Sequence, residues 1–167
     1  MGQRLLPQNL IELYAHALAI EREAFKRFIE LERLMREAKL DYIADEFQRI
    51  GREEQEQYEA LALGTAEREL PEIAPWEYAW HYLGPQADRV ATPKGAREAL
   101  AAALSSERRA QNFYVDVAEH AIDDAVCAFA AEMAADEQRH VQRLEQLLAR
   151  EPEAVKAVDD DAESVRR

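Results

Sequence analysis

Four glutamates and one histidine recur in this chain at spacings that suit metal binding. The glutamates are Glu21, Glu54, Glu107 and Glu137, and His140 follows the last of them in a Glu-x-x-His motif. Carboxylate and imidazole groups are ligands that iron and manganese accept in proteins. The residue types therefore indicate a carboxylate-rich centre for divalent metal ions.

Each of the four glutamates falls on the apolar side of a predicted helix. Residues seven apart lie on nearly the same helix face, so Glu21 shares a face with Tyr14 and Phe28. Glu107 shares its face with Tyr114 in the same way. A buried carboxylate without a partner costs several kcal/mol or takes up a proton. Two divalent cations would balance four such charges, so the pattern predicts a two-metal site.

The two halves of the sequence carry the same arrangement of residues. Residues 21–24 read Glu-Arg-Glu-Ala, and residues 107–110 read Glu-Arg-Arg-Ala. The second and fourth helices match as well, but the position equivalent to His140 holds Gln57. An amide oxygen is a weaker ligand than imidazole for these metals. We therefore predict two unequal metal positions, with Gln57 as a weak ligand.

Four helices are predicted to position these residues. Apolar side chains recur at helical spacing over residues 8–38, 41–63, 93–121 and 123–150. Gly64 is predicted to end the second helix, and Thr92 to cap the third. Asp123 or Asp124 is predicted to cap the fourth. Short connections join the first helix to the second and the third to the fourth, so each pair is expected to form a hairpin.

Residues 64–92 interrupt the helical pattern with glycines, prolines and a group of aromatic residues. A connection of this length is uncommon within a compact domain, but it suits a bundle with one long crossover. The predicted fold is all-α: a ferritin-like four-helix bundle made of two helical hairpins joined by that crossover. The bundle is expected to occupy residues 1–150, and the acidic segment 151–167 is expected to form a flexible tail.

Composition excludes several classes of function. The net charge of −13 argues against binding to a nucleic-acid backbone. Cys127 is the single cysteine, so neither an intrachain disulfide nor a cysteine-rich zinc or iron site can form, and we expect it to be a small core residue. No apolar run is long enough to span a membrane. Because the first residues do not resemble a signal peptide, we expect a cytoplasmic protein.

Over residues 8–150 the sequence resembles the rubrerythrin branch of the ferritin-like superfamily. The resemblance rests on Glu21 with an aromatic residue seven positions on, Glu54 in an acidic run, Glu107 with Tyr114, and Glu137-x-x-His140. It implies a non-haem di-iron centre that reacts with peroxide or dioxygen. The expected cofactor is two Fe ions, with Mn possible at one or both positions. Related folds often pair, so a homodimer or larger homo-oligomer is expected.

The sequence departs from the rubrerythrin pattern at three points. Gln57 replaces the second histidine. Ala110 stands where rubrerythrins carry an additional glutamate. The rubredoxin domain is missing, so electrons would have to come from an external donor. The resemblance also suggests that Tyr114 supports the site by a hydrogen bond to a ligand carboxylate.

The other histidines and the neighbouring acidic residues are expected to lie outside the centre. They are His16, His81, His120, Glu23, Glu53 and Glu56. We expect the three glutamates to face solvent, although Glu53 or Glu56 is close enough in sequence to replace Gln57 as a ligand.

Three functions are compatible with the sequence. The leading one is a di-iron oxidoreductase that reduces peroxide or dioxygen. The second is a ferroxidase or iron-handling protein, for which iron is a substrate as well as a cofactor. The third is a bundle whose metal site has decayed and which serves as a structural or partner-binding module, an interpretation that Gln57 and Ala110 favour.

Overall fold

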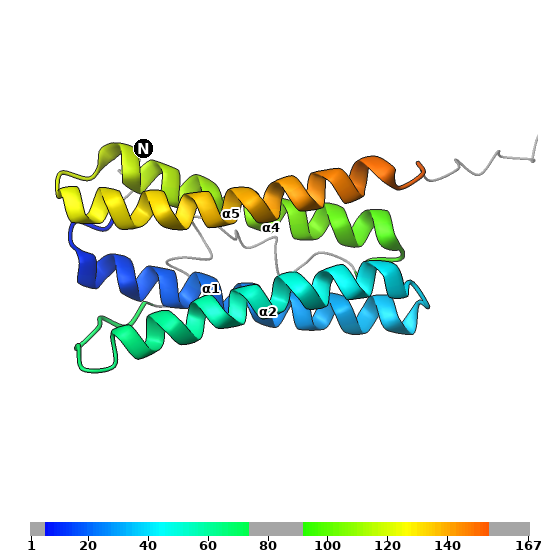
Figure 1. Ribbon diagram of the computed structural model, residues 1–167, viewed down its shortest axis with the longest axis horizontal. Coiled ribbons are helices and arrows are strands. Elements are labelled where there is room, and N and C mark those ends of the chain that lie inside the picture. Colours follow the sequence, from blue (N-terminus) through cyan, green and yellow to red (C-terminus); the bar gives the residue numbers. More distant parts are fainter. Residues whose placement is uncertain (1–5, 74–91, 154–167) are drawn as a thin grey trace, which may run out of the picture.

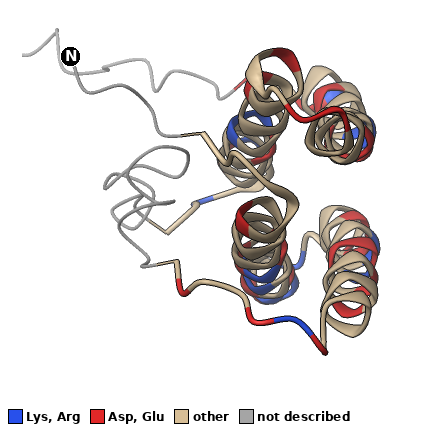
Figure 2. Cartoon of the chain, turned by 90° about the vertical axis from the view of Figure 1, so that its left-hand side faces the viewer, with Lys and Arg blue, Asp and Glu red and all other residues tan. Residues whose placement is uncertain are grey.

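In the residues that it describes, the computed structural model contains four long helices arranged side by side (Figure 1). It describes residues 6–73 and 92–153, and within these ranges there is no strand. The helices are α1 (Leu10–Glu37), α2 (Asp41–Gly64), α4 (Ala96–His120) and α5 (Asp124–Arg150). The view along the bundle shows them as two rows of two (Figure 2). The predicted all-α four-helix bundle is confirmed.

Each hairpin is joined by a very short turn. In the first, Lys39 adopts a left-handed backbone conformation with φ of 59°, and the amide of Leu40 donates to the carbonyl of Met35 at 2.8 Å. In the second, Asp123 caps α5 by accepting from the amide of Ala125 at 2.8 Å. Turns this short force neighbouring helices to run antiparallel, so the glutamates of each hairpin are held at a common level.

Two helix ends differ from the predicted ones, by three residues at the start of α4 and by one residue at the end of α2. The helix α4 begins at Ala96 rather than next to Thr92, because Gly95 is the N-cap. The carboxylate of Glu98 accepts from the amide of Lys94 at 2.9 Å, and this bond closes the first turn. The helix α2 continues through Gly64, and the hydroxyl of the next residue, Thr65, donates to the carbonyl of Leu61 at 2.8 Å.

The crossover links opposite ends of the bundle. The end of α2 and the start of α4 lie at opposite ends in Figure 1, and a short turn cannot join them. The aromatic residues noted in this segment lie in residues 74–91, as does His81, and so fall outside the described residues. Most of the predicted tail, residues 154–167, lies outside them too.

The apolar core consists of two clusters. One contains Phe28, Leu31, Met35, Ile43, Phe47, Ile50, Leu100, Leu104, Val141 and Leu144. The other contains Leu13, Ala17, Ile20, Ala110, Phe113, Tyr114, Val117, Val126, Ala130 and Met133. All four helices contribute fully buried residues to the first cluster, but α2 contributes none to the second. Glu54 is the last buried residue of α2.

The helices α1 and α2 come very close beside the level of the glutamates. A Cβ atom placed on Gly51 would lie 3.0 Å from the Cβ of Phe28, which is tighter than an ordinary carbon contact. Gly51 is one turn before Glu54 in α2. The absence of a side chain at this position therefore sets how closely Glu54 approaches α1.

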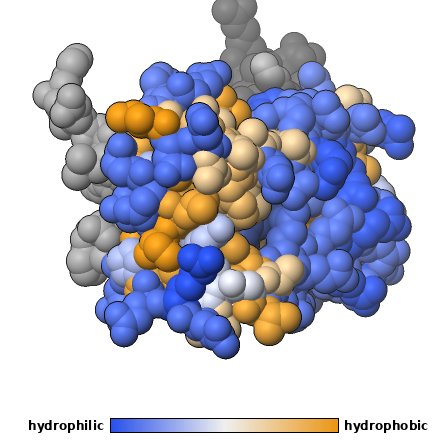
Figure 3. All heavy atoms as spheres, turned by 60° about the vertical axis from the view of Figure 1, so that its left-hand side comes forward, coloured by the Kyte–Doolittle hydropathy of each residue, from blue (hydrophilic) through white to orange (hydrophobic). Residues whose placement is uncertain are grey.

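The face of the bundle seen in Figure 3 is largely polar, with apolar side chains gathered at places on it. Among the most exposed apolar residues are Leu63 near the end of α2, at 81%, and Ile122 in the turn before α5, at 91%. In the described part of the chain, no helix combines the length and the apolar character that crossing a membrane requires.

Candidate metal centre

The five residues singled out by their spacing meet in the interior of the bundle. Glu21 comes from α1, Glu54 from α2, Glu107 from α4, and Glu137 and His140 from α5. All five are at most 3% exposed. One potential ligand atom from each of four of them, all but Glu21, lies within 4.8 Å of the others. The arrangement gathers carboxylate oxygens and one imidazole nitrogen at a single point.

His140 presents one ring nitrogen to the carboxylates. Its Nδ1 lies 2.7 Å from Oε1 of Glu54 and 3.3 Å from Oε2 of Glu107, without hydrogen-bond geometry to either. Its Nε2 lies 3.0 Å from Oε2 of Glu53. A carboxylate can only accept, so in the neutral ring Nε2 carries the proton and Nδ1 carries the lone pair. A lone pair facing carboxylate oxygens at this range calls for a cation or a shared proton between them.

Several carboxylate oxygens of the centre have no hydrogen-bond partner. They are Oε2 of Glu21, both oxygens of Glu54, Oε2 of Glu107 and Oε2 of Glu137. Leaving buried polar atoms unsatisfied costs free energy, and the few such atoms in natural proteins often mark a missing ion. The residues present therefore fit divalent cations, which would contact these oxygens and cancel their charge.

Electrostatics lead to the same conclusion. Burial raises the pKa of Glu54 well above its usual value, and the charges of Glu107 and Glu137 raise it further. Burial likewise raises the pKa of Glu137. Burial raises the pKa of Glu21, although the close approach of Glu54 and the hydrogen bond from Tyr114 partly oppose the shift. Without a cation these carboxyl groups therefore take up protons more readily than exposed carboxyl groups do, and metal binding would release those protons.

Tyr114 contacts the centre from α4. Its hydroxyl donates to Oε1 of Glu21 at 2.9 Å, and the side chain is fully buried. Burial, together with the nearby charge of Glu21, raises the pKa of Tyr114 well above its usual value, so the hydroxyl remains a donor. This bond leaves Oε2 of Glu21 free to face the interior.

Gln57 lies beside the centre but is bonded to the neighbouring helix. Its side-chain nitrogen donates to Oδ2 of Asp136 in α5 at 3.0 Å. Its role as a weak metal ligand stays a prediction.

Glu53 was expected to face solvent, and it does so only in part. Its side chain is 41% exposed, but one oxygen contacts His140 at 3.0 Å. Its other oxygen accepts from Arg143 at 3.1 Å. Burial would raise the pKa of Glu53, but these two partners outweigh burial and lower it. The repeat held a signal for this role, because Glu53 directly precedes Glu54 as Asp136 directly precedes Glu137.

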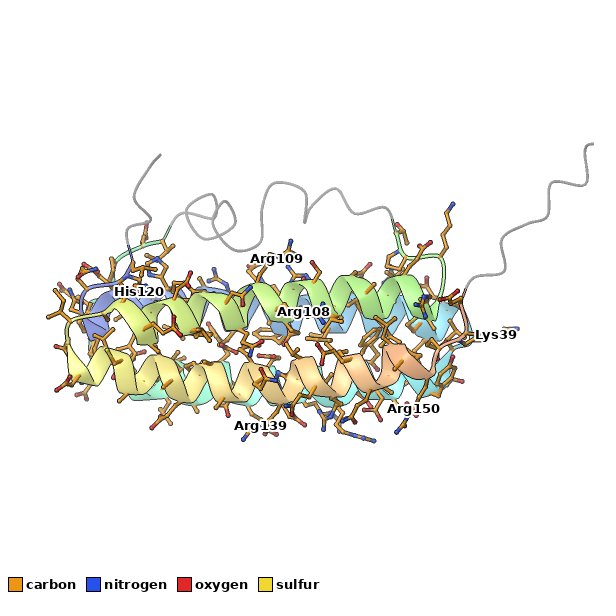
Figure 4. The ribbon with its side chains drawn as sticks, turned by 90° about the horizontal axis from the view of Figure 1, so that it is seen from above. Lys39, Arg108, Arg109, His120, Arg139 and Arg150 are labelled. Carbon is orange, nitrogen blue, oxygen red and sulfur yellow. The ribbon has the colours of Figure 1, made fainter. Side chains whose placement is uncertain are left out.

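The remaining candidates lie away from the centre. His120 is exposed at one end of the bundle (Figure 4). His16 stacks on Phe113, with ring centroids 5.7 Å apart, and bonds the carbonyl of Glu12. Glu56 is exposed. Cys127, expected in the core, is only partly buried, and its thiol donates to the carbonyl of Ala121 at 3.3 Å.

Comparisons with known proteins agree with this arrangement. The family model described as Rubrerythrin matches residues 12–149. The crystal structure of an uncharacterized conserved protein from Magnetospirillum magnetotacticum MS-1 is similar, with a TM-score of 0.79 and 27% sequence identity. The match covers 89% of this chain and 99% of that one. No match was found among curated proteins.

Proposed function

The chain belongs to the rubrerythrin family, and on that premise we propose that it is a non-haem di-iron carboxylate protein that reduces peroxide or dioxygen. Because its single cysteine cannot build a cysteine-rich iron site, the proposal includes an external electron donor. Manganese in place of iron at one or both positions is compatible with the same donor set.

One observation carries the proposal: the buried carboxylates around His140 lack the donors that would satisfy them. Five oxygens from the four glutamates are buried without a hydrogen bond. Protonation would neutralise these groups, and a proton shared between Glu54 and His140 would serve Nδ1, but each proton serves only one such contact. Cations would satisfy both the oxygens and the nitrogen, and bundles of this type bind metals with such residues.

The chain's own residues would have distinct tasks. Glu21, Glu54, Glu107, Glu137 and His140 would hold the ions, with Gln57 as a weak additional ligand. When bound, an iron pair supplies electrons and polarises the O–O bond of the substrate. Tyr114 fixes the orientation of Glu21 through its hydroxyl. The two apolar clusters on either side keep bulk water away and strengthen the electrostatic interactions inside the site.

The proposal includes unequal affinity at the two metal positions. His140 provides a nitrogen ligand on one side, while Gln57 provides only an amide oxygen on the other. The close group around His140 consists of Glu54, Glu107 and Glu137. We expect the position beside these residues to fill first.

Anaerobic titration with Fe(II), followed by metal analysis, tests this function. Two irons per chain, bound in separable steps, are expected, together with a new absorption band after peroxide is added. Reduction by an added donor should then allow further peroxide to be consumed. Glu137→Gln should prevent loading, while Glu132→Gln, exposed on the same helix, should not.

Other results of the same titration point to the other functions. Continued oxidation of each new addition of Fe(II) by dioxygen, without need of a donor, would favour iron handling. A wild-type protein that takes up no metal under anaerobic conditions would overturn the oxidoreductase proposal and leave a structural module.

A further inference from the structure

Two hydrogen bonds outside the metal centre are related by the internal repeat. Nε2 of His140 in α5 lies 3.0 Å from Oε2 of Glu53 in α2. The side-chain nitrogen of Gln57 in α2 lies 3.0 Å from Oδ2 of Asp136 in α5. Each hairpin thus supplies a carboxylate to the ligand position of the other hairpin.

The sequence positions of these four residues correspond one to one. Glu53 directly precedes the ligand Glu54, and Asp136 directly precedes Glu137. Gln57 and His140 each follow their own glutamate by three residues. The outer carboxylates, Glu53 and Asp136, are therefore part of the internal repeat, as the buried Glu54 and Glu137 are.

We propose that Glu53 and Asp136 are a pair of positioning residues that hold His140 and Gln57 from outside, so that each turns its other polar atom toward the metal ions. The inference rests on the proposed metal-binding function and extends it to residues that do not contact the metal. It also gives Gln57 a defined role, as an amide-oxygen ligand held in place before metal arrives.

Hydrogen-bond chemistry supports this assignment. A carboxylate oxygen accepts, so it binds an N–H group of either side chain. For His140 this leaves Nδ1 as the free atom, and Nδ1 is the nitrogen that lies beside Glu54 and Glu107. For Gln57 it leaves the amide oxygen. Bonded through its nitrogen, the amide of Gln57 offers one donor outward and one acceptor inward, as the neutral imidazole of His140 does.

Both outer carboxylates are themselves held by arginine. Arg143 donates to the two oxygens of Glu53 at 3.1 and 3.3 Å. Arg139, which projects outward from α5 (Figure 4), bonds the other oxygen of Asp136. Each carboxylate therefore bridges a surface arginine and a side chain beside the metal centre. Outer partners of this kind fix the orientation of metal ligands and raise metal affinity.

Removal of each outer carboxylate, with a matched control on the same helix, tests the proposal. The variants are Glu53→Ala and Asp136→Ala, and the controls are Glu56→Gln in α2 and Glu132→Gln in α5, both exposed. The probe is Co(II), titrated into the metal-free protein, with affinity and visible spectrum recorded. We expect roughly a 10- to 100-fold loss of affinity in the alanine variants and little change in the controls.

Conservative and restoring variants separate positioning from loss of fold. Glu53→Gln keeps an acceptor for Nε2 of His140, so it should restore much of the affinity and the spectrum that Glu53→Ala loses. Gln57→His should strengthen the weaker position. Asp136→Ala should cancel that gain if Asp136 orients residue 57.

A second readout does not depend on metal. In the metal-free protein, at a pH where the ring is neutral, ¹⁵N imidazole shifts should show the proton of His140 on Nε2, and Glu53→Ala should alter that tautomer preference, whereas Glu56→Gln should not. If the wild type binds Co(II) but the alanine variants match the controls in affinity and spectrum, the positioning proposal is wrong and the metal function stands. If the wild type binds no metal, the metal function fails, and unaltered His140 shifts in Glu53→Ala would overturn the positioning proposal too.

Discussion

Tyr114 and Glu21 lie on different hairpins, and the tyrosine hydroxyl donates to Oε1 of the glutamate at 2.9 Å. Both side chains are fully buried. The bond therefore joins the two hairpins at a place where solvent cannot supply a replacement hydrogen bond. Tyr114→Phe leaves Oε1 of Glu21 without a donor, and we expect the metal-free protein to lose about 1–3 kcal/mol of unfolding free energy. Urea denaturation measures this loss.

Tyr58→Phe is the matched control for that variant. Tyr58 is partly buried beside Phe25, with ring centroids 5.5 Å apart, so removing its hydroxyl keeps the aromatic contact. Equal losses in the two variants would show that the Tyr114–Glu21 bond has no special weight. A weaker metal affinity in Tyr114→Phe alone would show that the bond orients Glu21 as a ligand.

The stability of the metal-free protein should fall as the pH rises. Burial raises the pKa of Glu21, Glu54 and Glu137 above the usual 4.5. In that range the folded state binds more protons than the unfolded state does, so the stabilisation present below about pH 4.5 is lost as the pH approaches the raised pKa values. Interaction with Glu107 and Glu53 outweighs burial and raises the pKa of His140, which adds a contribution of the same sign.

Glu54→Gln should flatten this pH dependence, because a neutral amide replaces the carboxyl group whose pKa is shifted. Unfolding in urea at a series of pH values, with chelator present, measures the slope for wild type and variant. Glu56→Gln, which alters an exposed carboxylate nearby in α2, should keep the wild-type slope. An unchanged slope in Glu54→Gln would mean that Glu54 is not the source of the pH dependence.

Metal binding should stabilise the fold. A ligand that binds only the folded state adds about 2.7 kcal/mol when its free concentration is a hundred times its dissociation constant. The thermal midpoint should therefore rise with anaerobic Fe(II) and fall when a chelator is added. Glu137→Gln should remove this response, because it replaces one of the buried carboxylates of the centre.

Gly51→Ala should disturb the approach of α1 and α2. The new Cβ would lie 3.0 Å from the Cβ of Phe28, and neither atom can move without its helix. Gly64→Ala is the control, because a Cβ there meets nothing within 4 Å. We expect Gly51→Ala to be less stable than Gly64→Ala by about 1–3 kcal/mol, as measured by chemical denaturation. Equal stability would mean that the helices separate without cost.

The sequence predicted the fold well, because helical periodicity reports directly which face of each segment is buried. It also predicted that Glu21, Glu54, Glu107, Glu137 and His140 would meet, because charged residues on apolar helix faces are costly to bury unless they pair or bind ions. These predictions needed only the order of residues along each helix.

Features that depend on contact between helices were harder to predict. Glu53 and Asp136 are one residue from the ligand positions, so they point about a quarter of a turn away from the apolar face. Glu53 reaches His140 because of how α2 is turned about its axis toward α5, and the sequence does not reveal this orientation. The start of α4 was misplaced because Thr92 is a plausible cap, whereas Glu98 in fact closes the turn around Gly95.

Glu54 is the last buried residue of α2, and this has a consequence for local opening of the helix. The ten residues that follow in α2 contribute no fully buried side chain, and Leu61 is only partly buried against the second cluster, so their helical turns can open transiently while exposing little core surface. Amide hydrogens there should exchange with solvent sooner than those earlier in α2. Gln57 lies in this stretch, so local opening there would give metal ions an entrance to the proposed weaker metal position while the rest of the bundle stays closed.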